Sequence, residues 1–193
     1  EFWSVSLYKD FCKCEASALA RLNGDEKPKK SDALLLGSYV DSFMEGTLDA
    51  FKKEHPELFK KDGTLYAKYE IADKMIEKAT ESKKFMQYMS GEKQRIFTAD
   101  MFGVKWKCKL DSYIPGVAIV DLKTISKISD IGKWGYHIQA SVYQRIVEIN
   151  TGFKLPFYLA CVSKEEEPEL AIIQIPQSIM DETLLDIEEN IRR

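Results

Sequence analysis

The sequence lacks the features that mark membrane and repetitive proteins. No apolar run is long enough to span a bilayer, and no signal-peptide pattern stands at the start of the chain. Neither an internal repeat nor a low-complexity segment is present. These absences leave an ordinary globular protein, which we expect in the cytoplasm and away from membranes.

The sequence also has fewer basic than acidic residues. The chain carries 28 Lys and Arg against 31 Asp and Glu, for a net charge of −3. A basic field over the whole protein is therefore excluded, and any contact with nucleic acid must come from a local patch. The four cysteines (Cys12, Cys14, Cys108 and Cys161) do not suggest zinc, because Cys12-x-Cys14 has the wrong spacing for a zinc knuckle. We expect reduced, packed thiols.

The features that are present predict one α/β domain. A chain of 193 residues that is 45% hydrophobic can bury a single core over residues 1–193. Residues 1–92 are predicted to be mainly helical and residues 93–193 to contain the sheet. Predicted helices cover 6–22 (capped by Ser6), 32–51, 66–89, 134–149 and a closing amphipathic stretch through 180–191; predicted strands cover 96–101, 104–114, 117–124, 157–162 and 169–175.

The segment KLDSYIPGVAIVDLKT (109–124) places charged residues inside an apolar strand. Asp121 and Lys123 are two positions apart, so their side chains share one face, roughly 7 Å apart along the strand. If Pro115-Gly116 forms a two-residue hairpin turn, Asp111 pairs with residue 120, within one step of Asp121. Two acids from neighbouring strands would then converge beside one lysine.

Converging carboxylates repel each other, and a divalent cation relieves that repulsion. Oxygen ligands favour Mg²⁺ or Mn²⁺ over zinc. A lysine at such a site can orient or help deprotonate a water, or neutralise charge on a phosphate. The alternative is a surface ion pair between Asp121 and Lys123, because Asp-x-Lys is a common triplet.

Two predicted helices carry polar residues with the spacing of one helical face. Gly37 and Asp41 are one turn apart, and a glycine inside a helix is better explained if another segment approaches its backbone. Gln139 and Tyr143 have the same spacing and share their face with Tyr136, which suggests a polar surface at the mouth of a site. Ordinary solvated helix faces remain the alternative for both.

Further polar residues lie close to the predicted strands. Glu92 precedes the first strand and could add an oxygen ligand, although a plain surface acid explains it equally well. Lys105, Lys107 and Lys109 alternate with apolar residues and could line a local track for DNA on the face of Asp111, or form a solvated strand face.

Taken in order, these motifs resemble a known nuclease superfamily. Gly37-x-x-x-Asp41, Asp111, Asp121-Leu122-Lys123 and Gln139-x-x-x-Tyr143 are similar to the motif series of the PD-(D/E)XK nucleases, RecB-like branch, and most of all to phage and prophage RecE-type exonucleases. The opening VSLYKDFCKCEASAL resembles the N-terminal helix of that branch. The implied fold is α/β and restriction-endonuclease-like, a central mixed sheet flanked by helices with an N-terminal helical part.

The resemblance implies a Mg²⁺-dependent DNA exonuclease that hydrolyses phosphodiester bonds with metal-activated water. Asp111, Asp121 and the main-chain carbonyl of Leu122 would bind Mg²⁺, for which Mn²⁺ would substitute, and Lys123 would position the water. Gln139 and Tyr143 would contact DNA or hold the geometry of the site. Asp41 stands where the family usually has histidine, so it becomes a further metal-ligand candidate, as does Glu92. The late cysteine trio of the iron–sulfur members is missing, so no cluster is expected.

The resemblance also implies partners and a setting. Linear duplex DNA ends are the expected substrate, with a phage single-strand annealing protein as partner and a homo-oligomeric ring by analogy. The host would be bacterial and the gene of phage or prophage origin. Two competing interpretations remain open: a structure-selective endonuclease on the same fold, and a non-cutting module that binds DNA or a protein partner.

Overall fold

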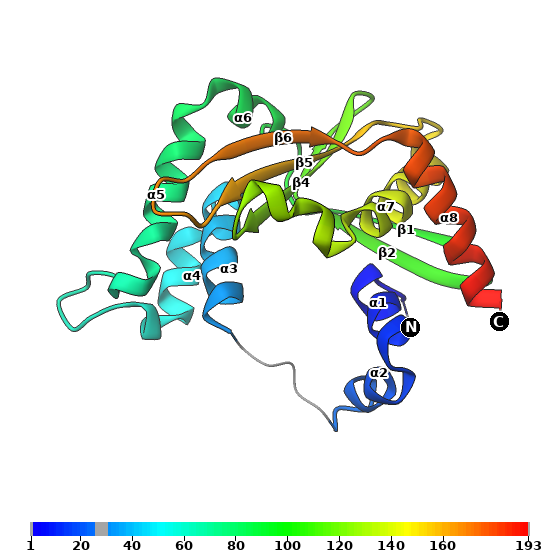
Figure 1. The fold of residues 1–193 in the computed structure, drawn as a ribbon, viewed down its shortest axis with the longest axis horizontal. Coiled ribbons are helices and arrows are strands. Elements are labelled where there is room, and N and C mark those ends of the chain that lie inside the picture. The colour runs from blue at the N-terminus through cyan, green and yellow to red at the C-terminus, as the bar shows by residue number, and fades with distance from the viewer. Residues whose placement is uncertain (1, 26–30, 193) are drawn as a thin grey trace.

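The computed structural model describes residues 2–25 and 31–192 (Figure 1). The helices are α1 (Val5–Lys13), α2 (Glu15–Leu22), α3 (Asp32–Glu45), α4 (Leu48–Glu54), α5 (Ala67–Glu81), α6 (Lys83–Tyr88), α7 (Tyr136–Thr151) and α8 (Gln177–Arg192), with 3-10 segments η1 (Pro56–Leu58) and η2 (Ile128–Trp134). The strands are β1 (Arg95–Met101), β2 (Val104–Leu110), β3 (Ser112–Ile114), β4 (Ala118–Ile125), β5 (Phe157–Ser163) and β6 (Leu170–Gln174). No helix within these residues is long and apolar enough to cross a membrane.

The main sheet is mixed, as the sequence predicts. Its strand order is β3-β4-β5-β6; β4 and β5 run parallel, and the outer pairs are antiparallel. The predicted continuous strand over 104–114 is wrong, because β2 ends at Leu110 and forms a separate two-stranded sheet with β1. Asp111 lies in the break between β2 and β3.

The register of the predicted hairpin is also corrected by one residue. Ile114 pairs with Ala118 and Ser112 with Val120, so the turn contains three residues rather than two. Val117 donates its backbone N–H to Ile114 O at 2.9 Å, and Gly116 has a left-handed φ of 69° that the tight turn requires. An additional turn residue shifts the whole ladder, because register follows from turn length.

Two apolar clusters cover the two faces of the main sheet. Along β4, Ile119 and Ile125 join the cluster that contains α1, α7 and α8, whereas Val120 and Leu122 join the cluster under α3 and α5. Because strand side chains alternate between faces, Asp121 and Lys123 lie on the α7 side of β4. The termini come together on this side, where Asn190 donates to the Tyr8 hydroxyl at 3.1 Å.

Three predicted helices begin or end elsewhere than the sequence suggests. The first is divided at Cys14, whose φ of −164° is extended, and its cap is Ser4 rather than Ser6. The second ends where Gly46 adopts a left-handed φ of 77°, and the chain resumes as α4. The helix predicted over 134–149 begins at Tyr136. Burial of the thiols is confirmed only for Cys108 and Cys161, since Cys12 and Cys14 are exposed.

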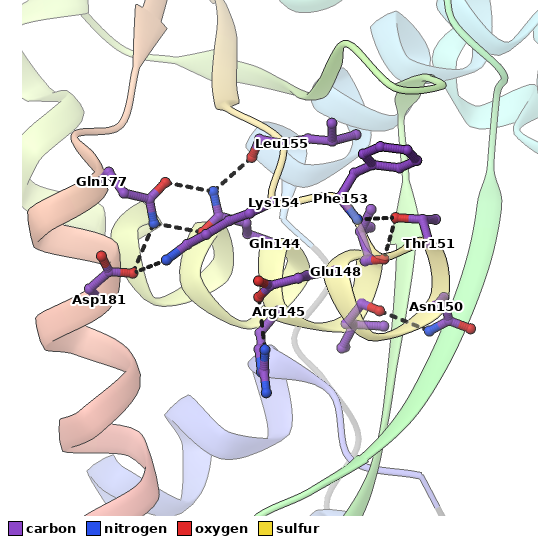
Figure 2. Close-up of polar contacts among 12 residues, drawn as sticks. Gln144, Arg145, Glu148, Asn150, Thr151, Phe153, Lys154, Leu155, Gln177 and Asp181 are labelled. Carbon is purple, nitrogen blue, oxygen red and sulfur yellow. Dashed lines mark hydrogen bonds and ion pairs between the residues drawn. The ribbon is translucent and has the colours of Figure 1, made fainter.

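A buried amide connects α7 to α8 and to the chain that enters β5 (Figure 2). Gln144 donates to Leu155 O at 2.7 Å and to Gln177 Oε1 at 2.9 Å, and Gln177 donates back to Gln144 Oε1 at 2.8 Å. Lys154 and Asp181 form an ion pair at 2.7 Å beside it. This network fixes the position of α7 relative to the sheet.

We predict that Gln144→Leu lowers the free energy of unfolding by about 1–3 kcal/mol, because the substitution removes the hydrogen bond to the carbonyl of Leu155 and both hydrogen bonds to Gln177. Arg145→Ala is the matched control: it removes an exposed ion pair with Glu148 from the same helix, which contributes at most about 1 kcal/mol. Urea unfolding followed by circular dichroism measures both. Equal losses for the two variants would contradict the prediction.

Candidate active site

Asp121 lies in the middle of β4 and is almost fully buried, with 3% of its surface exposed. Gln139 Nε2 on α7 donates to its Oδ1 at 2.7 Å. Its Oδ2 forms an ion pair with the ammonium of Lys123. The acid and the lysine of the Asp-x-Lys triplet therefore point the same way, as the strand period predicts; the acid is buried and the lysine is half-buried.

Asp111 reaches β4 through the break between β2 and β3. The β3–β4 ladder stops at Ser112 and Val120, and Asp111 Oδ2 then accepts the backbone N–H of Leu122 at 2.8 Å. Burial raises the pKa of Asp111 well above its usual range, and the carboxylates of Asp121 and Asp41 raise it further. The predicted convergence of two acids beside one lysine is present, although Asp111 is not on an exposed strand face.

Asp41 joins the same cluster from α3. Burial raises its pKa to about 6, with Lys123 opposing that shift and Asp121 adding to it. The helix approaches β4 closely at Gly37, where a Cβ atom would lie 2.9 Å from Thr124 Oγ1. The interpretation of this glycine as a point of close approach is confirmed, and α3 can bring Asp41 to the site because Gly37 has no side chain.

Helix α7 covers the acid–lysine pair with the predicted polar face. The ring of Tyr136 lies 5.1 Å from Lys123 Nζ, and Gln139 contacts Asp121 directly. Tyr143 packs against Phe157 with ring centroids 6.4 Å apart, and burial raises the pKa of its hydroxyl. Tyr143 thus lies deeper than Gln139, and a role in contacting DNA stays a prediction.

Lys9 on α1 is a neighbour of the site that the sequence analysis missed. Its Nζ donates to Trp134 O at 3.0 Å. Burial lowers the pKa of Lys9, and the positive charge of Lys123 lowers it further, which places the two ammonium groups within electrostatic reach. No motif spacing relates α1 to β4, so the sequence carries no signal for this contact.

Glu92 is not brought into the carboxylate cluster. Half of its side-chain surface is exposed, and its Oε2 faces Arg95 Nε at 3.9 Å. Its backbone pairs with Tyr113 on β3, so the residue borders the site through the main chain only. As a metal ligand, Glu92 has no support from this geometry.

The site offers few protein ligands to a cation. Among residues 2–25 and 31–192, no three His, Cys, Asp or Glu side chains form a ready-made metal cage. Asp111 and Asp121 with the main-chain carbonyl of Leu122 are a donor set that suits Mg²⁺, which keeps several waters and needs only one or two carboxylates. Burial chiefly, and then the charges of Asp121 and Asp41, disfavour the ionised form of Asp111, and the charge of Lys123 opposes this only in part. A divalent cation would favour the ionised carboxylates, so the residues present fit such an ion.

Known proteins resemble this chain in both sequence and structure. Residues 4–193 match the family described as a PDDEXK-like domain of unknown function, DUF3799. The chain is similar to the crystal structure of a protein from Eubacterium rectale named "Putative exonuclease", with a TM-score of 0.96. The two sequences are 46% identical, and the match covers 100% of this chain and 79% of that chain. No curated protein matches the sequence. The mixed α/β fold is therefore confirmed as PDDEXK-like, and the chain belongs to the DUF3799 family of PDDEXK-like domains.

Proposed function

We propose that this protein is a Mg²⁺-dependent exonuclease that hydrolyses phosphodiester bonds at the ends of linear duplex DNA. The observation that carries the proposal is the buried convergence of Asp111 and Asp121 beside Lys123. A purely structural role does not explain why Asp111, whose ionisation is disfavoured by burial and by the charge of Asp121, lies beside that carboxylate in the protein interior. Membership of a PDDEXK-like family and similarity to a protein named as an exonuclease support the same reaction.

Each side chain has a role that its contacts support. Asp111, Asp121 and the carbonyl of Leu122 would hold the cation, for which Mn²⁺ would substitute; the cation would neutralise phosphate charge and supply the attacking water. Burial lowers the pKa of Lys123, but the carboxylate of Asp121 outweighs it and holds that pKa above its usual range. We therefore assign Lys123 the role of a positive charge that orients water and phosphate.

Asp121→Asn should reduce Mg²⁺-dependent release of nucleotides from end-labelled linear duplex DNA by at least about 100-fold, equivalent to about 3 kcal/mol of barrier. The substitution keeps the shape of the side chain but removes the charge that binds the cation and holds Lys123. Asp181→Asn on α8 is the matched control, because its exposed carboxylate pairs only with groups far from the site. Activity in EDTA sets the background.

Three outcomes of that assay separate the competing functions. Retained activity in Asp121→Asn would refute the assignment of the site. Cutting of covalently closed circular DNA would show an endonuclease, because an exonuclease needs an end. Binding of DNA without any release of nucleotides, in the wild-type protein with Mg²⁺, would favour a non-cutting module.

Without a cation, the acidic cluster destabilises the folded protein. Asp41 has a pKa of about 6 because burial disfavours its charged form. Its ordinary value is 3.8, so the folded state binds the proton more tightly than the unfolded state does. The resulting cost to folding is fully present above about pH 6 and disappears as the pH falls toward the unfolded value.

We therefore expect Asp41→Asn to raise the free energy of unfolding at about pH 8 by on the order of 1–3 kcal/mol, and to have little effect at about pH 4. Urea unfolding in EDTA at the two pH values tests this. Asp181→Asn serves as the control of opposite sign, since Lys154 lowers the pKa of Asp181. A stabilisation by Asp41→Asn that is equal at both pH values would contradict the electrostatic explanation.

Lys105, Lys107 and Lys109 provide the local positive patch that an acidic protein needs for DNA. All three are exposed on β2, which ends beside Asp111, and they follow the strand at steps of roughly 7 Å. Lys109 also lines the hollow that contains Asp41. We infer that this strand guides the phosphate backbone toward the carboxylate cluster.

Charge reversal in Lys105→Glu/Lys107→Glu should weaken binding to duplex DNA and reduce the slope of log affinity against log salt by about 1–2, since each phosphate contact contributes about 0.9. Lys83→Glu/Lys84→Glu on α6 changes the net charge equally on another surface. Fluorescence anisotropy over a salt series, in EDTA, measures both variants. A loss of the same size in the α6 variant would mean that net charge, not the β2 track, decides binding.

The motif resemblance extends this proposal to a biological setting. A RecE-type enzyme of phage or prophage origin would process DNA ends for recombination in the bacterial cytoplasm, beside a single-strand annealing protein. A homo-oligomeric ring around duplex DNA belongs to the same analogy.

A further inference from the structure

Trp134 is an exposed tryptophan at the end of η2. Its surface is 56% exposed, whereas Trp106 is fully buried and Trp3 is half-buried. The segment around it is anchored, because Ile128 and Ile131 pack against the main apolar cluster. A large aromatic side chain that stays exposed to solvent on an anchored segment is available to bind a ligand.

The backbone of Trp134 is held beside the catalytic lysine. Lys9 on α1 donates to Trp134 O at 3.0 Å, and Gly135 follows with a left-handed φ of 60°. A Cβ atom on Gly135 would lie 3.6 Å from Lys9 Nζ, so α1 and this turn are in close contact. The next residue is Tyr136, whose ring lies 5.1 Å from Lys123 Nζ. Trp134 is thus two residues from a side chain that contacts the site.

The surroundings of the indole suit a nucleic acid strand better than a protein surface. From 126 to 134 the other exposed residues are serine, lysine and glycine, so Trp134 is the exposed aromatic residue of an otherwise polar segment. Lys127 and Lys133 are exposed on the same segment, Lys133 in an ion pair with Asp130, and Lys9 donates to its backbone at Trp134 O. An aromatic side chain among cations is the combination that binds single strands, by base stacking and phosphate attraction.

We propose that the Trp134 indole stacks on an unpaired nucleobase of the strand that enters the active site. This inference rests on the proposed nuclease function and adds a subsite for the base next to the scissile phosphate. Stacking uses the π-face that every base has, so the contact is independent of sequence. It orients the strand end while Lys123 and the carboxylate cluster act on the phosphate.

The test uses a short 5′-phosphorylated single strand and the full chain in EDTA, where hydrolysis is blocked. We expect binding to quench the tryptophan fluorescence, and Trp134→Ala to abolish most of that quenching and weaken binding roughly tenfold. Trp134→Phe should retain most of the affinity, because phenylalanine still stacks. Phe153→Ala is the matched control, as Phe153 is 60% exposed and follows the C-terminal end of α7, opposite to the end that Trp134 precedes.

A strand with abasic terminal positions completes the experiment. Wild-type protein should bind it about as weakly as Trp134→Ala binds the normal strand, and Trp134→Ala should not distinguish the two strands. Wild-type affinity in Trp134→Ala, or an equal loss in Phe153→Ala, would overturn the inference while leaving Mg²⁺-dependent hydrolysis intact. Failure of the nuclease proposal itself would appear separately, as absence of hydrolysis by the wild-type protein.

Discussion

The carboxylate of Asp111, at the break between β2 and β3, lies close to that of Asp121 in β4, and their mutual repulsion is the constraint on which the site depends. Asp111 can reach β4 only because the ladder ends at Val120 and leaves the N–H of Leu122 to its carboxylate. Lys123 then offsets part of the negative charge by pairing with Asp121. The remaining excess of acid is the physical reason to expect a cation.

The helices around the sheet hold this unfavourable arrangement in place. Helix α3 brings Asp41 close because Gly37 leaves room for Thr124. Helix α7 provides the amide of Gln139, and the buried amide of Gln144 fixes that helix to α8 and to the chain before β5. Stability is contributed by the two apolar clusters, so the polar site can remain strained without unfolding the domain.

An acidic protein can still act on DNA when its positive charges are local. Lysines on β2 lead to the carboxylate cluster, Lys9 donates to the backbone of Trp134, and Lys123 faces the ring of Tyr136 two residues further on. Coulombic attraction at these points is short-ranged at physiological salt, so the net charge of −3 matters less than the position of each lysine. The proposed division of labour is guidance by β2, stacking by Trp134 and hydrolysis at β4.

Local chemistry in the sequence by itself determined most elements and the key residues. The strand period places Asp121 and Lys123 on one face, and the helical period groups Gly37 with Asp41 and Gln139 with Tyr143. Tertiary structure alone decided the break at Asp111, the three-residue turn, the exclusion of Glu92 and the approach of Lys9. The reason is that periodicity reports which face a residue occupies, whereas ladder ends, register and contacts between distant segments depend on how whole elements pack.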